Sequence, residues 1–231
     1  MKTKREMAPK FWRIETKTKT FTTSPSPGPH PAFSSFPLRI MIRDILGIAE
    51  SATEARTILN AGKIQVDGVV RKDPGFPVGL MDVIHVPDMQ KYYRVMPSQK
   101  GLTIKEMTKD YDKKMLKIKN KRMLRGNKIQ LNFHDGSNLI TAKADYKPND
   151  VVVVKLPSKE ITAHVSLDTG VSLLITGGKN IGRIAKLKKI EKISGSRADE
   201  LTVETEDGDH KTQIKFVFAI GKEKPLIDLG E

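Results

Sequence analysis

Hydrophobic positions between residues 38 and 62 recur every three to four residues, which is the period of a helix with one buried face. The first set predicts a helix that ends at Gly47, and it consists of Leu38, Met41, Ile42, Ile45 and Leu46. Ser51 is followed three residues later by Glu54, the spacing of a capping box at the start of a second helix. Gly62 ends that helix, whose buried side is Ala55, Ile58 and Leu59.

The segment after the second helix has the pattern of short strands. KIQV-DG-VVR predicts a hairpin, because Asp67 and Gly68 accept the positive φ angles of a type I′ turn. DPGFPVG is irregular, and MDVIHV predicts another short strand. Two short helices, a hairpin and a returning strand therefore predict a compact domain over residues 38–97.

Residues 98–166 predict a small central β domain, with strands in IQLNFHDG, NLITAK, DVVVVKLP and EITAHV. Within it, residues 113–128 carry eight basic and no acidic side chains. A solvated segment normally mixes both signs, so this unbroken stretch indicates contact with phosphates. The apolar residues within it indicate one packed face, made of Met115, Leu116, Ile118, Met123 and Leu124.

Residues 167–231 place the apolar stretch VSLLI before the glycine-rich TGGKNIGR and the alternating KLKKIEKI. Gly177 and Gly182 have the spacing of a nucleotide-binding P-loop, but Arg183 and Ile184 stand where that loop needs a lysine and a hydroxyl. The dinucleotide fingerprint GxGxxG is also absent. Further alternating strands are predicted in ELTVETEDG, HKTQIKFV and FAIG, and the glycines permit tight backbone bends.

Residues 1–37 differ from the rest in composition. Seven Lys or Arg precede position 20, and five prolines between positions 25 and 37 disfavour helix and predict an extended, polyproline-like path. Spaced aromatic residues could stack on RNA bases or pack on the protein, and they are Phe11, Trp12, Phe21, Phe33 and Phe36. A disordered linker is the alternative for the protein alone.

Composition narrows the range of functions. The 41 Lys and Arg against 27 Asp and Glu give a formal charge of +14, for which nucleic acid is the commonest counterpart. The absence of Cys excludes disulfides and thiolate metal sites and fits a reducing, cytoplasmic location. The five His are scattered without metal-site spacing, so no metal is expected. No apolar run is long enough for a membrane span, and the basic start lacks the apolar stretch of a signal peptide.

The two-helix and hairpin pattern resembles the alpha-L RNA-binding domain shared by bacterial ribosomal small-subunit protein four, some pseudouridine synthases and bacterial tyrosyl-tRNA synthetases. That superfamily often carries Ser-Arg-x-x-Ala-Arg at its second helix. Here Ser51, Ala55 and Arg56 match, whereas Ala52 replaces the first arginine. RNA contact is therefore expected to shift to other basic side chains of the domain, namely Arg39, Arg43, Lys63, Arg71 and Lys72.

The apolar strand, glycine-rich turn, Gly-Arg pair and alternating strand resemble the KOW motif of small SH3-like barrels. The whole order is similar to small-subunit ribosomal protein four of the eukaryotic and archaeal type, through APKFW, PGPHP, DGVVRKDPGFPVGLMDVI and TGGKNIGRI. The ending IGKEKPLIDLGE resembles archaeal members. This resemblance implies an α+β, multidomain protein with an extended N-terminal arm, an alpha-L-like domain, a central β domain and a KOW barrel.

The same resemblance implies a structural constituent of the small subunit of cytoplasmic ribosomes, bound to small-subunit ribosomal RNA and neighbouring ribosomal proteins. It implies no catalysis, cofactor, membrane or small-molecule substrate. The expected RNA-binding residues are Lys10, Trp12, Arg13, Arg39, Arg43, Arg56, Lys63, Arg71, Lys72, Lys113, Lys114, Lys117, Lys119, Lys121, Arg122, Arg125, Lys128, Lys179, Asn180 and Arg183. An acidic patch is expected to face away from RNA, toward solvent or a basic neighbour, and comprises Asp199, Glu200, Glu204, Glu206, Asp207 and Asp209.

Two other functions are compatible with parts of this pattern. Alpha-L domains are often fused to pseudouridine synthases, but that chemistry needs a catalytic Asp in a large α/β domain, and the middle of this chain is too short and too basic. A transcription or translation factor that uses a KOW barrel as a docking module is the second alternative. A factor would cycle on and off its machine, whereas a structural component would stay bound through a salt wash.

Overall fold

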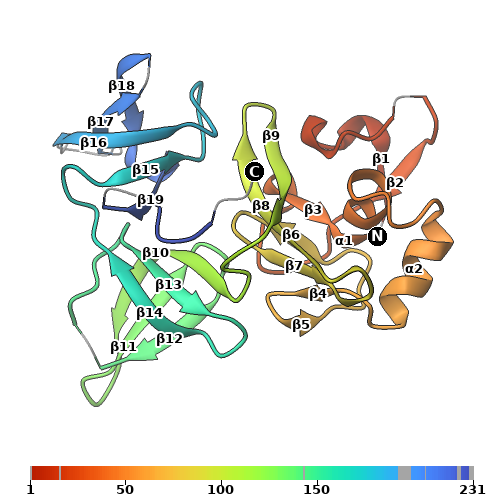
Figure 1. Ribbon diagram of the computed structural model, residues 1–231, viewed down its shortest axis with the longest axis horizontal. Helices are drawn as coiled ribbons and strands as arrows, with labels where there is room; N and C mark the ends of the chain where they lie inside the picture. The colour runs from red at the N-terminus through yellow and green to blue at the C-terminus, as the bar shows by residue number, and fades with distance from the viewer. Residues whose placement is uncertain are drawn as a thin grey trace. The chain divides into compact units, whose positions relative to one another are not determined.

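The computed structural model describes residues 2–15, 17–142, 144–191, 199–205, 207–222 and 225–228. The chain forms two compact units (Figure 1). The first is built from Met1–Met96 and Lys100–Asp112, and the second from Pro97–Gln99 and Lys113–Leu229. The four expected segments therefore share two bodies, because the arm packs with the alpha-L-like segment and the central strands pack with the C-terminal ones.

The helices of the first unit follow the predicted periodicity. α1, Leu38–Ile40, continues into a π-helical turn, Met41–Ile45, and Gly47 follows with φ of 64°. α2, Ala52–Asn60, has Ser51 as its N-cap. The Ser51 hydroxyl accepts a hydrogen bond from the Glu54 amide at 3.0 Å, as the capping box predicts. The Glu54 carboxylate accepts from the amide of Glu50 at 2.9 Å, one residue before the cap.

The strands of the first unit form three sheets, ordered β1-β2, β3-β6 and β5-β4-β7-β8-β9. Their bounds are β1 Lys2–Lys4, β2 Phe21–Thr23, β3 Ser35–Pro37, β4 Gln65–Val66, β5 Val69–Val70, β6 Pro77–Gly79, β7 Val83–Val86, β8 Lys91–Ser98 and β9 Gly101–Met107. Asp67 and Gly68 have φ of 52° and 75°, which confirms the hairpin turn predicted between β4 and β5. β9 extends this sheet, although its residues were expected in the central domain.

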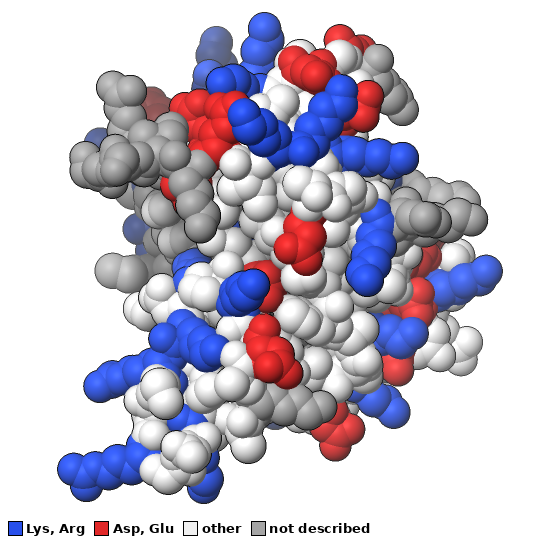
Figure 2. Space-filling model, turned by 90° about the vertical axis from the view of Figure 1, so that its left-hand side faces the viewer, with Lys and Arg blue, Asp and Glu red and all other residues white. Residues whose placement is uncertain are grey.

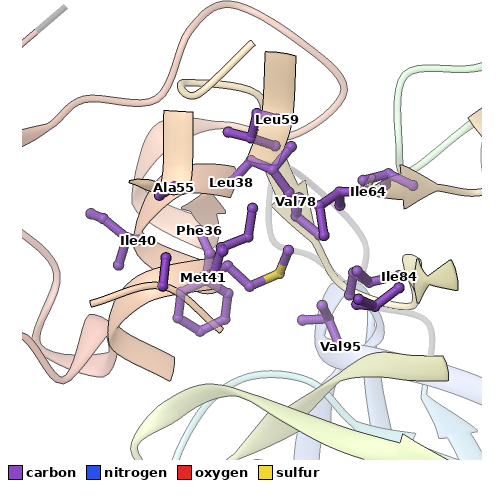
Figure 3. Close-up of a cluster of buried hydrophobic side chains, with 14 of the residues drawn as sticks. Phe36, Leu38, Ile40, Met41, Ala55, Leu59, Ile64, Val78, Ile84 and Val95 are labelled. Carbon is purple, nitrogen blue, oxygen red and sulfur yellow. The ribbon is translucent and has the colours of Figure 1, made fainter. Parts of the chain in front are cut away.

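One core joins the helices, the sheets and the N-terminal arm. Figure 3 shows Phe36 and Met41 directed into the same interior as Leu59 of α2 and Val95 of β8. Trp12 of the arm lies in this cluster at 1% exposure, and its indole N–H donates to the carbonyl of Ser35 at 2.8 Å. The arm therefore packs on the protein, and the alternative of a disordered linker is wrong for these residues.

The proline-rich part of the arm is less extended than predicted. Ala32–Ser34 form a 3₁₀ turn, and β3 pairs antiparallel with β6. The buried ring of His30 lies 3.0 Å from the buried carboxylate of Asp82, which fixes this segment to the turn after β6. A proline lacks the amide donor but keeps its carbonyl, so a proline-containing segment can still pair at the edge of a sheet.

The second unit contains two five-stranded antiparallel sheets, ordered β12-β11-β10-β13-β14 and β18-β17-β16-β15-β19. The first sheet contains β10 Lys113–Met123, β11 Ile129–Phe133, β12 Asn138–Thr141, β13 Val151–Lys155 and β14 Glu160–Val165. The second contains β15 Ser172–Ile175, β16 Ile184–Glu191, β17 Glu200–Thr205, β18 Gly208–Gln213 and β19 Val217–Gly221. Strands occur in all the segments predicted for this half of the chain, but HKTQIKFV is not one strand, because Ile214–Phe216 form a 3₁₀ turn between β18 and β19.

The two sheets of the second unit are joined by buried polar contacts. The Lys117 ammonium donates to the carbonyls of Ile214 and Val217, each at 2.8 Å, so β10 is tied to the start of β19. His134 meets Phe218 edge-on with ring centroids 5.4 Å apart. Burial without a carboxylate among these contacts lowers the pKa of Lys117 to about 8.

No helix in the described part of the chain has the length and apolar character needed to cross a membrane.

Candidate nucleic-acid interface

The end of the β10–β11 hairpin carries a cluster of positive charge without carboxylate partners. We call it the hairpin tip and define it by Lys119, Lys121, Arg122, Arg125 and Lys128. The Leu124 amide donates to the Lys128 carbonyl at 2.8 Å, which closes the turn and keeps the basic side chains on a regular hairpin. Among the described residues, none of the five has a carboxylate within ion-pairing distance.

In the face that Figure 2 shows, basic side chains project at the lower left, where the side chains around them are uncharged. Met123, between Arg122 and the turn, is 72% exposed, so the tip also presents an apolar side chain. Lys121 donates to the carbonyl of Ala144 and is the one member held partly against the protein. Charges of one sign that lack partners create a positive potential, which attracts a polyanion and releases its counterions on binding.

The first half of β10 differs from the expectation that all basic residues of 113–128 contact RNA. Lys114 and Lys117 are buried, and neither side chain can reach RNA from this fold. Lys114 pairs with the buried Asp135 at 3.2 Å, and its charge lowers the pKa of that carboxyl against the effect of burial. Lys113 is half-buried and has partners within the protein. The basic stretch therefore divides into an inner structural part and an outer exposed part.

In the first unit, the helical arginines predicted to bind RNA lie close enough to repel one another. Burial, followed by the charges of Arg43 and Arg56, lowers the pKa of the Arg39 guanidinium. Arg39 donates from Nε to the Thr23 hydroxyl at 2.6 Å, while Arg43 pairs with the adjacent Asp44 at 2.7 Å. A bound phosphate would relieve the remaining repulsion.

The other basic residues predicted for the alpha-L-like domain have different environments. Lys63 forms an ion pair with Asp88 at 2.6 Å, with both side chains about half exposed. The Arg71 guanidinium lies 4.5 Å above the ring of Phe76, a cation–π contact. Lys72 is exposed. Exposed ion pairs are weak, so Lys63 can still exchange its partner for a phosphate.

In the arm, Lys10 and Arg13 are exposed, but the expectation for Trp12 is wrong because its ring is in the core. The structure adds a basic hollow of about 490 Å³ that the sequence pattern did not reveal. It is lined by Lys4, Arg5, Glu6, Lys17, Thr18, Lys19 and Thr20. The sequence shows the basic residues of this hollow at spaced positions near 4 and near 18. Only the antiparallel pairing of β1 with β2 brings these two segments together.

The glycine-rich turn of the C-terminal sheet has the geometry predicted from its glycines. Gly178 and Gly182 have φ of 86° and 85°, which glycine adopts readily. A Cβ on Gly177 would collide with the ring of Phe216. The turn presents Lys179 and Asn180 along a groove of about 310 Å³ between it and strands β17 and β18.

Charge in the C-terminal sheet is largely paired. Arg183 forms an ion pair with Asp207, and the Lys188 ammonium lies 2.7 Å from Asp209 and 3.3 Å from Glu204. These contacts modify the expectation for the acidic patch. Three of its five described members, Glu204, Asp207 and Asp209, pair with Arg183 or Lys188 of the same unit. Glu206 lies outside the described residues. Figure 2 shows acidic and basic side chains mixed at the upper end of this face.

The described residues contain no cluster of three or more His, Cys, Asp or Glu that could hold a metal ion. Their exposed functional groups are mainly cations, and these are distributed over both units. This arrangement is suited to binding an extended polyanion.

Three family models match successive parts of the chain. The RS4NT (NUC023) domain matches residues 1–32, the S4 domain residues 44–84, and the ribosomal family S4e residues 89–161. The first two fall on the arm and on the segment with α2 and the β4–β5 hairpin. The third begins before β8 and ends within β14.

Curated relatives cover almost the whole chain. The small ribosomal subunit protein eS4 of Archaeoglobus fulgidus is 42% identical over 230 residues, which is 98% of this chain and 97% of the relative. The protein of the same name from Methanocaldococcus jannaschii is 42% identical over 235 residues, covering 98% and 96%. The crystal structure of 30S ribosomal protein S4e from Thermoplasma acidophilum has a TM-score of 0.71 at 33% identity, covering 82% of this chain and 96% of that one.

The matches show that the protein is a ribosomal protein, and its structure is rich in strands and basic residues. The chain belongs to the ribosomal family S4e.

Proposed function

We propose that the protein is a structural constituent of the small subunit of cytoplasmic ribosomes and binds small-subunit ribosomal RNA. The main support is that relatives called small ribosomal subunit protein eS4 align over 98% of the chain. The fold adds a physical reason, because cations without carboxylate partners remain exposed on the hairpin tip. Neighbouring ribosomal proteins are the further partners in this proposal, which includes neither catalysis nor a cofactor.

RNA binding in this proposal depends mainly on phosphates. Each lysine or arginine that contacts a phosphate releases counterions, so affinity falls as salt rises. The proposed contacts include the hairpin tip, Lys10 and Arg13, and the basic hollow of the arm. They also include the remaining predicted cations and polar groups, namely Arg39, Arg43, Arg56, Lys63, Arg71, Lys72, Lys179, Asn180 and Arg183.

We retain four functional segments within the two compact units. They are the arm at 1–37, an alpha-L-like domain at 38–97, a central β domain at 98–166 and a KOW-type, SH3-like barrel at 167–231. Segments joined in one chain raise each other's effective concentration, so contacts that are weak alone become tight together.

The test is sedimentation of ribosomes after a high-salt wash, with the protein expressed at its natural level. We expect it to remain with the small subunit at about one copy per particle, because many simultaneous phosphate contacts must dissociate together. Release into the soluble fraction at moderate salt would overturn the structural role. The alternative of a cycling factor predicts that release and has no support among the named relatives.

A further inference from the structure

One face of the five-stranded sheet of the first unit packs on the core. The opposite face is partly covered, because Val83 and Arg94 on it are 3% and 0% exposed. Along β7, Ile84 and Val86 are buried at 0% and 2% exposure, while His85 between them points to the opposite face. In β8, Tyr93 packs against the core, and Tyr92 therefore lies on the opposite face, where it is half-buried. Alternation along strands thus places a row of flat rings away from the helices.

Three rings on this opposite face form a continuous stack, of which Tyr111 is the exposed end. His85 and Tyr92 are directly opposite in the β7–β8 register, with ring centroids 4.1 Å apart and planes within 2°. Tyr111 covers the other side of Tyr92, with centroids 4.3 Å apart and planes at 23°. Burial lowers the pKa of His85, which favours the neutral form of its ring within the stack.

The protein fixes the outer ring in place. Tyr111 follows Asp110, whose backbone has φ of 53° and whose carbonyl accepts from the buried Arg94 guanidinium at 3.1 Å. His85 at the inner end is held by Gln65 at 3.3 Å. The stack is therefore organised before any ligand arrives, and that lowers the ordering cost of binding.

The outer side of the stack is unused within the protein. Tyr111 is 48% exposed, and neither its hydroxyl nor that of Tyr92 has a hydrogen-bond partner among the described residues. Lys109, two residues earlier in the same loop, is exposed and has no carboxylate partner in that part of the chain. A flat ligand with a hydrogen-bonding edge and an attached anion would satisfy all three features, and an RNA nucleotide has these properties.

We propose that Tyr111 stacks on an unpaired nucleobase of RNA, extending the His85–Tyr92–Tyr111 column by a fourth ring, while Lys109 contacts a neighbouring phosphate. This inference rests on the proposed function, because it specifies one mode of RNA binding. It assigns a recognition role to a surface outside the helical arginines and the hairpin tip. Duplex RNA keeps its bases stacked internally and should not use this surface.

The test uses the full-length protein and a short single-stranded RNA with one 2-aminopurine, beside a duplex of the same length. Wild type and Tyr111→Phe should bind the single strand and quench 2-aminopurine, since both keep the aromatic face. Tyr111→Leu should lose the quenching and about 5- to 100-fold in affinity for the single strand, with an unchanged salt slope. Lys109→Gln should keep the quenching and lower the salt slope by about 0.7.

Tyr111→Trp provides a second readout that does not depend on a destabilised variant. The chain contains one tryptophan, Trp12, and it is buried, so the introduced indole is the exposed reporter. Unlabelled single-stranded RNA should quench this reporter, and duplex RNA should not. Quenching by both RNAs alike, or wild-type affinity and quenching in Tyr111→Leu, would overturn the stacking proposal.

The same titrations separate this inference from the proposed function. If variants of the hairpin tip weaken RNA binding while Tyr111→Leu has no effect, RNA binding stands and the stacking site is wrong. If wild type binds neither RNA at low salt, the proposed function itself fails.

Discussion

The hairpin tip and the C-terminal sheet are both rich in lysine, yet they use it differently. At the tip, cations lie on the end of β10 and on the turn after it, and the paired strand β11 has no acidic residue. In the C-terminal sheet, β16 runs antiparallel to β17, and the register places Lys186 opposite Glu204 with Lys188 near Asp209. Cross-strand carboxylates therefore neutralise one region and leave the other available. The number of basic residues in a segment does not by itself identify a binding surface.

The largest effect on RNA affinity should come from removing the unpaired cations of the hairpin tip. Changing Lys119, Arg122, Arg125 and Lys128 together to Gln should weaken RNA binding by about two to three orders of magnitude near physiological salt, because about four phosphate contacts are lost. The slope of log affinity against log salt should fall by about 3. Filter binding across a salt series measures both quantities.

A matched control removes cations that already have carboxylate partners. Lys188→Gln, Lys189→Gln and Lys211→Gln together should change RNA affinity much less than the tip variant does. Equal losses from the two combined variants would show that pairing does not determine availability, and the comparison between the two regions would fail.

The buried lysine of β10 should affect stability instead of RNA binding. In the unfolded chain the pKa of Lys117 is about 10.5, and burial lowers it to about 8 in the fold. Between these values the unfolded chain holds more protons, so stability rises with pH across this window. Relative to Lys117→Met, the wild type should gain up to about 3 kcal/mol in free energy of unfolding from pH 8 to 10.5.

Denaturant unfolding at several pH values measures this difference between wild type and Lys117→Met. A difference that stays constant between pH 8 and 10.5 would mean that the two backbone carbonyls keep the ammonium charged in the fold. RNA affinity at neutral pH should be the same for both proteins, which separates this lysine from those of the tip.

A smaller effect should follow from freeing a paired lysine. Glu204→Gln with Asp209→Asn removes both carboxylates next to Lys188 and should raise RNA affinity a few-fold, with a salt slope steeper by about 0.7 to 0.9. An unchanged salt slope would mean that the C-terminal sheet faces away from RNA even when its charge is free.

The smallest effect should be on stability in the C-terminal sheet. Lys188→Gln should leave the midpoint of thermal unfolding nearly unchanged, because solvent screens exposed ion pairs. Hydrogen bonding to Asp209 raises the pKa of Lys188, so any small contribution should persist to higher pH than for a free lysine. A clear loss of thermal stability would indicate a structural role that the exposed geometry does not suggest.

Local patterns were sufficient for most elements. Apolar spacing located α1 and α2, Ser51 and Glu54 located a helix start, and Asp67-Gly68 located a hairpin, because these signals act over a few residues. The succession of motifs along the chain was also sufficient to indicate the family.

The same reasoning failed for residues whose partners are distant in sequence. Trp12 and Lys117 were both predicted to contact RNA, and both are buried. Lys117 meets carbonyls about a hundred residues later, so no window of neighbouring sequence contains its partners. For the same reason the basic hollow of the arm and the Tyr111 stack were not anticipated.

The sequence by itself determined most of the secondary structure, the net charge of +14 and the membership of a ribosomal family. Only the tertiary structure decided which cations are free, which are paired across strands and which are buried. The physical reason is that helix period, turn geometry and total charge are set locally or by composition. The availability of a charge depends on strand register and burial, which are set by residues far apart in the chain.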